Sequence, residues 1–228
     1  MLASFLNLLF PNVCVGCQNP LTQGEVLLCT QCRFELPIFD NFNQSNTQLA
    51  EKFYGKVSVN QANAFLKFSQ GGMTQRLLHQ LKYNNKPEVG LMLGRIFGIA
   101  LAKVNYQTQI DLIVPVPLHS SKQSSRGYNQ CDGFAQGLSE ALERPWTQDT
   151  LIKTKATASL SKERMDRLGR FETLEKVFEI AKPEAINGQR ICLVDDVITS
   201  GATLEVCTAE LLKSGAKLVN VLGLATKS

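Results

Sequence analysis

The feature that most restricts how this chain can fold is a thirteen-residue run near its carboxyl end, 191–203. It begins with four apolar residues, continues with the adjacent carboxylates Asp195 and Asp196, and ends in a turn of small and hydroxyl-bearing residues. An unbroken apolar strand is typical of a parallel sheet that is covered on both faces. Such sheets bind ligands at the carboxyl ends of their strands. The run therefore predicts an α/β fold with a ligand site beside the two carboxylates.

The turn after the carboxylates has the composition of a phosphate-binding loop, and it consists of Thr199, Ser200, Gly201, Ala202 and Thr203. None of these side chains is bulky, and glycine can adopt backbone conformations that other residues avoid. Backbone N–H groups and hydroxyls can therefore converge on a phosphate at the start of the following helix. Carboxylates beside a phosphate would be repelled unless they accept hydrogen bonds, which ribose hydroxyls can donate. The run predicts a ribose 5-phosphate site; the alternative is an ordinary strand-turn-helix whose acids only cap the turn.

Apolar strands alternate with helical patterns along most of the chain. The spacing of apolar residues predicts strands over 62–68, 110–116, 190–197 and 217–225, and helices over 73–81, 87–104, 130–143 and 203–214. Alternation of this kind is typical of an α/β domain with a mostly parallel sheet. With 228 residues, of which 44% are hydrophobic and 19% charged, the chain has enough apolar side chains for a real core.

Four cysteines form two closely spaced pairs in the first 32 residues: Cys14 and Cys17, then Cys29 and Cys32. Four thiolates at this spacing satisfy the tetrahedral preference of Zn²⁺, and a site with four protein ligands is structural because it leaves no position open. Two disulfides are the alternative. The amino terminus lacks the positive start and small-residue cleavage site of a signal peptide, so we expect a reducing cytosol, which favours zinc.

These patterns divide the chain into three parts. We expect a helix and zinc module over 1–37, a linker over 38–58 that lacks a sustained apolar period, and an α/β domain over 59–228. No apolar run approaches the roughly 20 residues that a membrane-spanning helix needs. The formal net charge of +4 is too small to indicate a nucleic-acid surface by itself.

The run 191–203 resembles the phosphoribosyl pyrophosphate (PRPP) motif of the phosphoribosyltransferases, in which an apolar strand, two acids and a Thr/Ser-Gly-Ala-Thr turn follow one another. Together with the paired cysteines, three further motifs resemble the ComF family, also called GntX-like, of competence-associated proteins. These motifs are Leu81-Lys82-Tyr83, Pro115-Val116-Pro117-Leu118 and Arg126-Gly127-Tyr128-Asn129-Gln130. The resemblance covers nearly the whole chain and implies a type I phosphoribosyltransferase fold with an amino-terminal zinc module.

The same resemblance implies roles for three cationic residues. Lys82 would lie near the pyrophosphate of PRPP, Arg126 beside the strand that ends at Val116, and Arg164 in the loop 157–170 that closes over the site in this class. Solvated surface charge is the alternative for Lys82 and Arg126, and a mixed-charge helix is the alternative for the loop. Asn85 stands where the family usually has glycine, and asparagine is one of the few other residues that tolerate a left-handed turn.

The resemblance also implies a function: a cytoplasmic protein, free or at the inner face of the membrane, that natural transformation requires when incoming single-stranded DNA is taken up and processed. Its partners would be PRPP with Mg²⁺, and a helicase or recombination-mediator protein. The alternative is an active phosphoribosyltransferase of nucleotide or purine metabolism with an unknown acceptor. Direct binding of DNA by the cysteine module is weakly supported, because Arg33 is the only basic residue from Met1 to Glu51.

Overall fold

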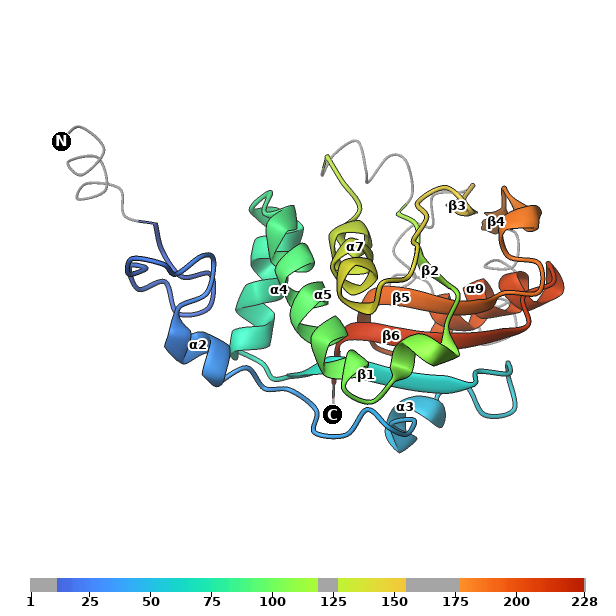
Figure 1. The fold of residues 1–228 in the computed structure, drawn as a ribbon, viewed down its shortest axis with the longest axis horizontal. Coiled ribbons are helices and arrows are strands. Elements are labelled where there is room, and N and C mark those ends of the chain that lie inside the picture. The colour runs from blue at the N-terminus through green and yellow to red at the C-terminus, as the bar shows by residue number, and fades with distance from the viewer. Residues whose placement is uncertain (1–11, 119–126, 155–176, 228) are drawn as a thin grey trace, which may run out of the picture.

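A computed structural model of the chain describes residues 12–118, 127–154 and 177–227. Within these ranges four strands form one parallel sheet in the order β1-β6-β5-β2, and a short antiparallel pair, β3 and β4, lies apart from it (Figure 1). The strands are β1 Gln61–Phe68, β2 Leu112–Pro115, β3 Leu151–Lys153, β4 Phe178–Ile180, β5 Arg190–Ile198 and β6 Leu218–Lys227. The predicted α/β architecture with a parallel sheet is confirmed; β3 and β4, of three residues each, are too short for a periodicity signal.

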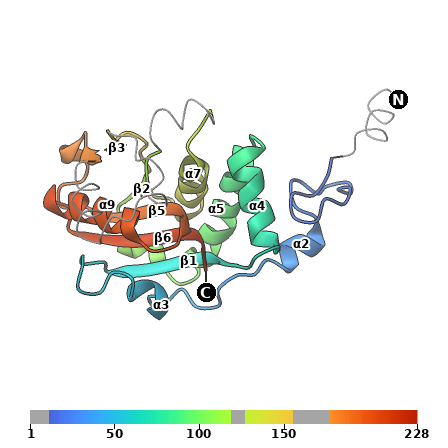
Figure 2. The ribbon, with the colours of Figure 1, turned by 180° about the vertical axis from the view of Figure 1, so that it is seen from behind.

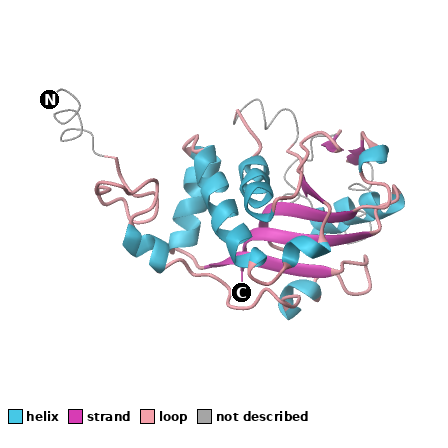
Figure 3. Ribbon diagram, viewed as in Figure 1, coloured by secondary structure: helices cyan, strands magenta, loops and turns pink. Residues whose placement is uncertain are grey.

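Helices cover both faces of the parallel sheet, as Figures 2 and 3 show. The α-helices are α2 Thr30–Phe34, α3 Thr47–Ala50, α4 Met73–Tyr83, α5 Pro87–Ala102, α7 Gln130–Leu142 and α9 Ala202–Lys213, and the 3₁₀ helices are η1 Tyr106–Gln109 and η2 Pro183–Ala185. Successive residues of β5 point to opposite faces. Cys192 and Val194 belong to the core that α4, α5 and α7 complete, whereas Ile191 and Leu193 belong to the core under α9.

Residues 38–58, for which a linker was predicted, pack against the sheet. The backbone N–H of Phe39 donates to the carbonyl of Phe65 in β1, with 3.0 Å between nitrogen and oxygen. Farther along the segment, Phe42, Leu49 and Phe53 are buried, and α3 lies under the sheet beside β1 (Figure 1). The segment therefore joins the core of the α/β domain through isolated anchors, which a search for helical or strand periodicity does not detect.

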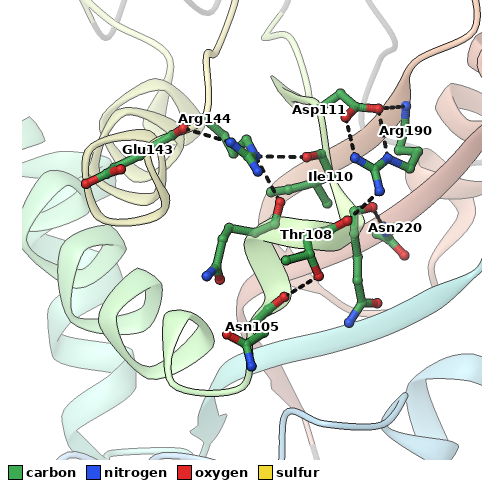
Figure 4. Close-up of polar contacts among 10 residues, drawn as sticks. Asn105, Thr108, Ile110, Asp111, Glu143, Arg144, Arg190 and Asn220 are labelled. Carbon is green, nitrogen blue, oxygen red and sulfur yellow. Dashed lines mark hydrogen bonds and ion pairs between the residues drawn. The ribbon is translucent and has the colours of Figure 1, made fainter.

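An ion pair fixes the amino ends of two neighbouring strands. Arg190 begins β5 and Asp111 immediately precedes β2, and the guanidinium Nε donates to the carboxylate at 2.9 Å while the Arg190 backbone N–H donates to the same oxygen at 2.9 Å (Figure 4). Hydrogen bonds from the Arg190 side chain, joined by the Arg190 backbone N–H and opposed by burial, lower the pKa of Asp111 to about 2, below its usual range. This contact lies at the edge opposite the predicted ligand site, so it serves the fold.

Acid should remove the contribution of this pair. Because the pKa of Asp111 is lower in the folded chain than the ordinary value of about 3.9, its stabilisation is present above about pH 4 and is lost as the pH falls toward 2. We expect Asp111→Asn to lower the melting temperature at pH 7 and to have about half that effect at pH 3, where the folded carboxyl is still mostly ionised. Asp40→Asn, at an exposed carboxylate 3.6 Å from Lys67, is the control and should change little at either pH.

Candidate functional site

The two adjacent carboxylates lie near the carboxyl end of β5, where one of them meets a lysine from another element. Lys82 belongs to the last turn of α4, and its Nζ lies 2.7 Å from Oδ2 of Asp196. Both side chains are largely shielded, with 23% and 18% of their surfaces exposed. The family resemblance implied a place near the pyrophosphate for Lys82; the structure places it in the last turn of α4, where its ammonium contacts Asp196.

Asp195 is held by two hydrogen bonds from protein groups. Its Oδ1 accepts hydrogen bonds from the backbone N–H of Asp196 at 2.8 Å and from the Cys131 thiol at 3.6 Å. Burial, and next the charge of Asp196, raise the pKa of Asp195 to about 7, against the lowering effects of the Asp196 N–H, Lys82 and Cys131. Such a displaced pKa in a carboxylate pair is typical of functional sites, where charge is held in place for a ligand.

The raised pKa of Asp195 should make the free energy of unfolding depend on pH. Between the ordinary aspartate pKa of about 3.9 and the folded value of about 7, the unfolded chain loses the Asp195 proton and the folded chain keeps it. Stability therefore falls as the pH rises through this window. We expect Asp195→Asn to match the original protein near pH 4 and to be progressively more stable toward pH 8, as measured by urea unfolding. An equal difference at both pH values would contradict the raised pKa.

The turn after the carboxylates encloses a small hollow. It has a volume of about 50 Å³ and is lined by Asp195 and by residues 197–204. Gly201 takes the N-cap position of α9 with φ of +80°, a left-handed conformation that glycine adopts at least cost. The first N–H groups of a helix have no partner within the helix, so they are available to an anion at this end. The five residues predicted for the phosphate loop thus lie together at a helix start.

Residues of the segment 38–58 pack against this turn and against the start of α9. A Cβ added to Gly201 would lie 3.4 Å from Cβ of Lys52 and from the ring of Phe53. Lys56 Nζ lies 3.8 Å from a carboxylate oxygen of Glu205, in the first turn of α9. The residues behind the turn were not found by sequence reasoning, because nothing in the local pattern connects them to a loop so distant along the chain.

The motif that contains Tyr128 lies beside the end of β2. The resemblance implied this place for Arg126, which belongs to the same motif. Asn129 caps α7 by accepting the N–H of Cys131 at 3.3 Å, and its amide donates to the carbonyl of Val116 at 3.1 Å. The Tyr128 hydroxyl donates to the backbone carbonyl of Leu81. Sequence reasoning missed the thiol of Cys131 as a neighbour of the carboxylates; its position one residue after the motif was the available signal.

Several predicted residues lie outside the described ranges. They are Arg126, Arg164, the remainder of the loop 157–170 and the amino-terminal helix over the first residues. Asn85, by contrast, is described and has φ of +50°, so the asparagine takes the left-handed turn that was expected of it. The roles of Lys82, Arg126 and Arg164 in chemistry stay predictions.

The four amino-terminal cysteines come together. Their sulfur atoms all lie within 4.8 Å of one another, and Cys17 and Cys29 have Sγ atoms 3.8 Å apart. A tetrahedron with zinc–sulfur bonds of about 2.3 Å has an edge of roughly 3.8 Å, whereas a disulfide needs about 2.05 Å. All seven cysteines are unpaired. The cluster is therefore able to hold a metal, and its geometry disfavours the disulfide alternative.

Backbone N–H groups donate hydrogen bonds to the Cys14 sulfur and so favour its thiolate form. Cys14 is buried, and its sulfur accepts the N–H groups of Gly16 and Cys29, each at 3.3 Å. Burial alone would raise the pKa of Cys14, but hydrogen bonds from the backbone of Cys29, Cys17 and Gly16 bring it down to about 7. Arg76 of α4 donates its Nε to the Gly16 carbonyl at 2.5 Å and so ties the module to the α/β domain. Donors aimed at ligand sulfurs are a usual second layer of a metal centre.

Comparison with known proteins points to one group of relatives. Competence protein F of Haemophilus influenzae is 28% identical over 223 residues, which cover 93% of this chain and 96% of that protein. This chain is homologous to competence protein F. The DNA utilization protein YhgH of Escherichia coli K12 is 32% identical over 148 residues, 64% of this chain, and competence protein ComFC of Bacillus subtilis is 29% identical over 148 residues. The matched part spans 63% of the length of YhgH and 57% of ComFC. No protein-family model matches the sequence.

Among solved structures, the glutamine PRPP amidotransferase of B. subtilis, in complex with ADP and GMP, gives a TM-score of 0.44 at 20% identity and covers 64% of this chain and 30% of its own. A purine phosphoribosyltransferase of Pyrococcus horikoshii gives 0.34 at 24% identity and covers 58% of this chain and 73% of its own. Scores this low carry no weight for function. Among the described residues, no helix has both the length and the apolar character needed to cross a bilayer.

Proposed function

We propose that this protein acts in natural transformation, in the uptake and processing of incoming single-stranded DNA. The match to competence protein F over almost the full length of both chains supports this role. The proposal includes a cytoplasmic location, free or at the inner face of the membrane, and a helicase or recombination-mediator protein as partner.

We further propose that the α/β domain binds PRPP or another ribose 5-phosphate. The observation that carries this proposal is the hollow in which Asp195 and the Gly201 turn lie together at the start of α9. In this arrangement the N–H groups and hydroxyls of the turn hold the 5-phosphate. Asp195 and Asp196 accept hydrogen bonds from the two ribose hydroxyls. Carboxylate oxygens are also the ligands that Mg²⁺ takes, so the ion that accompanies pyrophosphate fits beside them.

A second candidate function is transfer of the phosphoribosyl group to an acceptor, with pyrophosphate leaving. The ammonium of Lys82, 2.7 Å from Asp196, favours it, because a cation beside the ribose site can stabilise the charge of departing pyrophosphate. Arg126 and Arg164 are the predicted partners of Lys82 in this step. Release of pyrophosphate from PRPP in the presence of nucleobases or amines would support transfer, and its absence with every acceptor would leave binding as the function.

We also propose that the four-cysteine cluster holds Zn²⁺ in a structural role. Four sulfur ligands fill the tetrahedral coordination of zinc and leave no position for a substrate. Cys14, Cys17, Cys29 and Cys32 would be the ligands, and the bound ion would hold a module too small to build its own core. As a direct partner of this module, single-stranded DNA is a weaker candidate than a helicase or recombination-mediator protein.

Calorimetric titration tests the ribose-phosphate site. Zinc-loaded protein is titrated with PRPP and Mg²⁺ beside the variant Asp195→Asn/Asp196→Asn, with Asp40→Asn as the exposed control. Removing two negative charges would by Coulomb's law alone strengthen the binding of an anion. We expect the double variant to bind at least about tenfold more weakly, because it loses charge-assisted hydrogen bonds and a metal contact. Equal or tighter binding by the double variant, or no binding by the original protein, would reject the proposed site.

A further inference from the structure

Tyr128 is fixed to the end of the helix that carries Lys82. Its hydroxyl donates to the backbone carbonyl of Leu81, in the last turn of α4. The last four carbonyls of a helix have no partner within the helix, so this bond satisfies a group that would otherwise lack one. Leu81 is fully buried and directly precedes Lys82, so the bond holds the backbone at the base of the lysine side chain.

Cys131, three residues later, is fixed to the carboxylates. The Cys131 thiol is buried and donates to Oδ1 of Asp195 at 3.6 Å. The same oxygen accepts the backbone N–H of Asp196 at 2.8 Å. The Cys131 thiol therefore contacts the oxygen of Asp195 that also orients the backbone of Asp196. Donation by Cys131 thereby restrains Asp195 in the position from which it would face a ligand.

These contacts close a ring through three elements. On α4, the backbone carbonyl of Leu81 accepts the Tyr128 hydroxyl. The next residue, Lys82, places its ammonium 2.7 Å from the carboxylate of Asp196 on β5. Asp195, which precedes Asp196, accepts the Cys131 thiol. The segment between Tyr128 and Cys131 is itself anchored, because Asn129 caps α7 and donates to the carbonyl of Val116, the residue that follows β2. A change in the spacing of α4 and β5 would break at least one contact of this ring.

We propose that Tyr128 and Cys131 are positioning residues of the ribose-phosphate site, which hold the Lys82 ammonium and the paired carboxylates at the spacing that the ligand requires. The inference rests on the proposed ribose-phosphate function of the same site. Neither residue needs to touch the ligand: Tyr128 acts through the backbone that carries Lys82, and Cys131 acts through Asp195. The competing explanation is that both bonds only stabilise the fold.

Two measurements separate these explanations. In the first, PRPP with Mg²⁺ is titrated into the zinc-loaded original protein, Tyr128→Phe, Cys131→Ala and Cys131→Ser, and the melting temperature of each is recorded. The Tyr128 bond joins two neutral groups, and the Cys131 thiol is a weak donor at 3.6 Å, so we expect Tyr128→Phe and Cys131→Ala to bind about threefold to tenfold more weakly. Cys131→Ser keeps a donor and should retain the original affinity. Tyr54→Phe removes the hydroxyl of an exposed tyrosine and is the control.

The second measurement needs no ligand. It is a double-mutant cycle of urea unfolding with Tyr128→Phe, Lys82→Met and their combination. If Tyr128 holds Lys82 against Asp196, the double variant loses less stability than the sum of the single losses. Additive losses would overturn the role of Tyr128 even if the original protein failed to bind PRPP.

The outcomes also distinguish the two proposals. Absence of PRPP binding by the original protein would reject the ribose-phosphate function, and the cycle would still decide whether Tyr128 positions Lys82. Binding by the original protein with unchanged affinity in Tyr128→Phe and Cys131→Ala, whatever their melting temperatures, would reject the positioning role and leave the binding site standing. Failure of Cys131→Ser to restore affinity would reject the hydrogen bond as the reason for the Cys131 effect.

Discussion

Gly137→Ala is expected to destabilise the protein by about 3 kcal/mol, because α5 and α7 pack with their backbones in contact. A Cβ at Gly137 would lie 2.2 Å from the carbonyl oxygen of Leu91 and 2.7 Å from the backbone nitrogen of Arg95. Neither atom can rotate away, so the two helices must separate. Gly94 faces the same contact from α5, where an added Cβ would lie 2.4 Å from the carbonyl oxygen of Phe134. Domains of this size are stable by roughly 5–15 kcal/mol, so the loss is large.

The matched control is another glycine of the same helix pair. An alanine Cβ at Gly90 would meet its nearest neighbours, Cδ1 of Leu81 and the backbone nitrogen of Phe134, at 3.3 Å. Alanine also gains about 1 kcal/mol of helix propensity over glycine, which offsets this mild crowding. Urea unfolding should therefore show Gly90→Ala within about 1 kcal/mol of the original protein. Equal effects of the two substitutions would mean that the helices are not packed as closely as described.

Cys14→Ser is expected to abolish metal binding and to unfold the amino-terminal module while the parallel sheet stays folded. Structural zinc contributes on the order of 10 kcal/mol to small metal-held modules, and a serine hydroxyl is a poor replacement for a thiolate. The buried Cys14 sulfur also accepts two backbone N–H groups, which the variant leaves weakly paired. Metal content per chain should fall from about one to near zero, and amide exchange should accelerate over 12–36 with little change in the strands.

Cys207→Ala provides the comparison for this variant. Cys207 is equally buried but lies on α9, among the apolar residues of the other core, away from the four-cysteine cluster. Its removal should leave the metal content unchanged and lower stability only modestly. Full metal content in Cys14→Ser, or loss of metal in Cys207→Ala, would show that the four amino-terminal sulfurs are not the metal ligands.

The sequence by itself determined the parts of this protein that local pattern encodes. The apolar run before Asp195 predicted a buried parallel strand, and the small residues around Gly201 predicted the turn at the start of α9, because burial on both faces and a left-handed turn each demand particular residue types. The spacing of the paired cysteines predicted that their sulfurs would meet, because a short loop between two pairs closes easily on one point.

Only the tertiary structure decided which distant residues complete the site. Lys82 reaches Asp196, and the Cys131 thiol reaches Asp195 across 64 residues of sequence, because α4 and α7 pack on the same face of the sheet. The segment 38–58 packs against the turn 199–203 through Phe53, an isolated apolar residue without periodicity. Contacts of this kind depend on the crossing of helices and the order of strands, and no local residue preference encodes them.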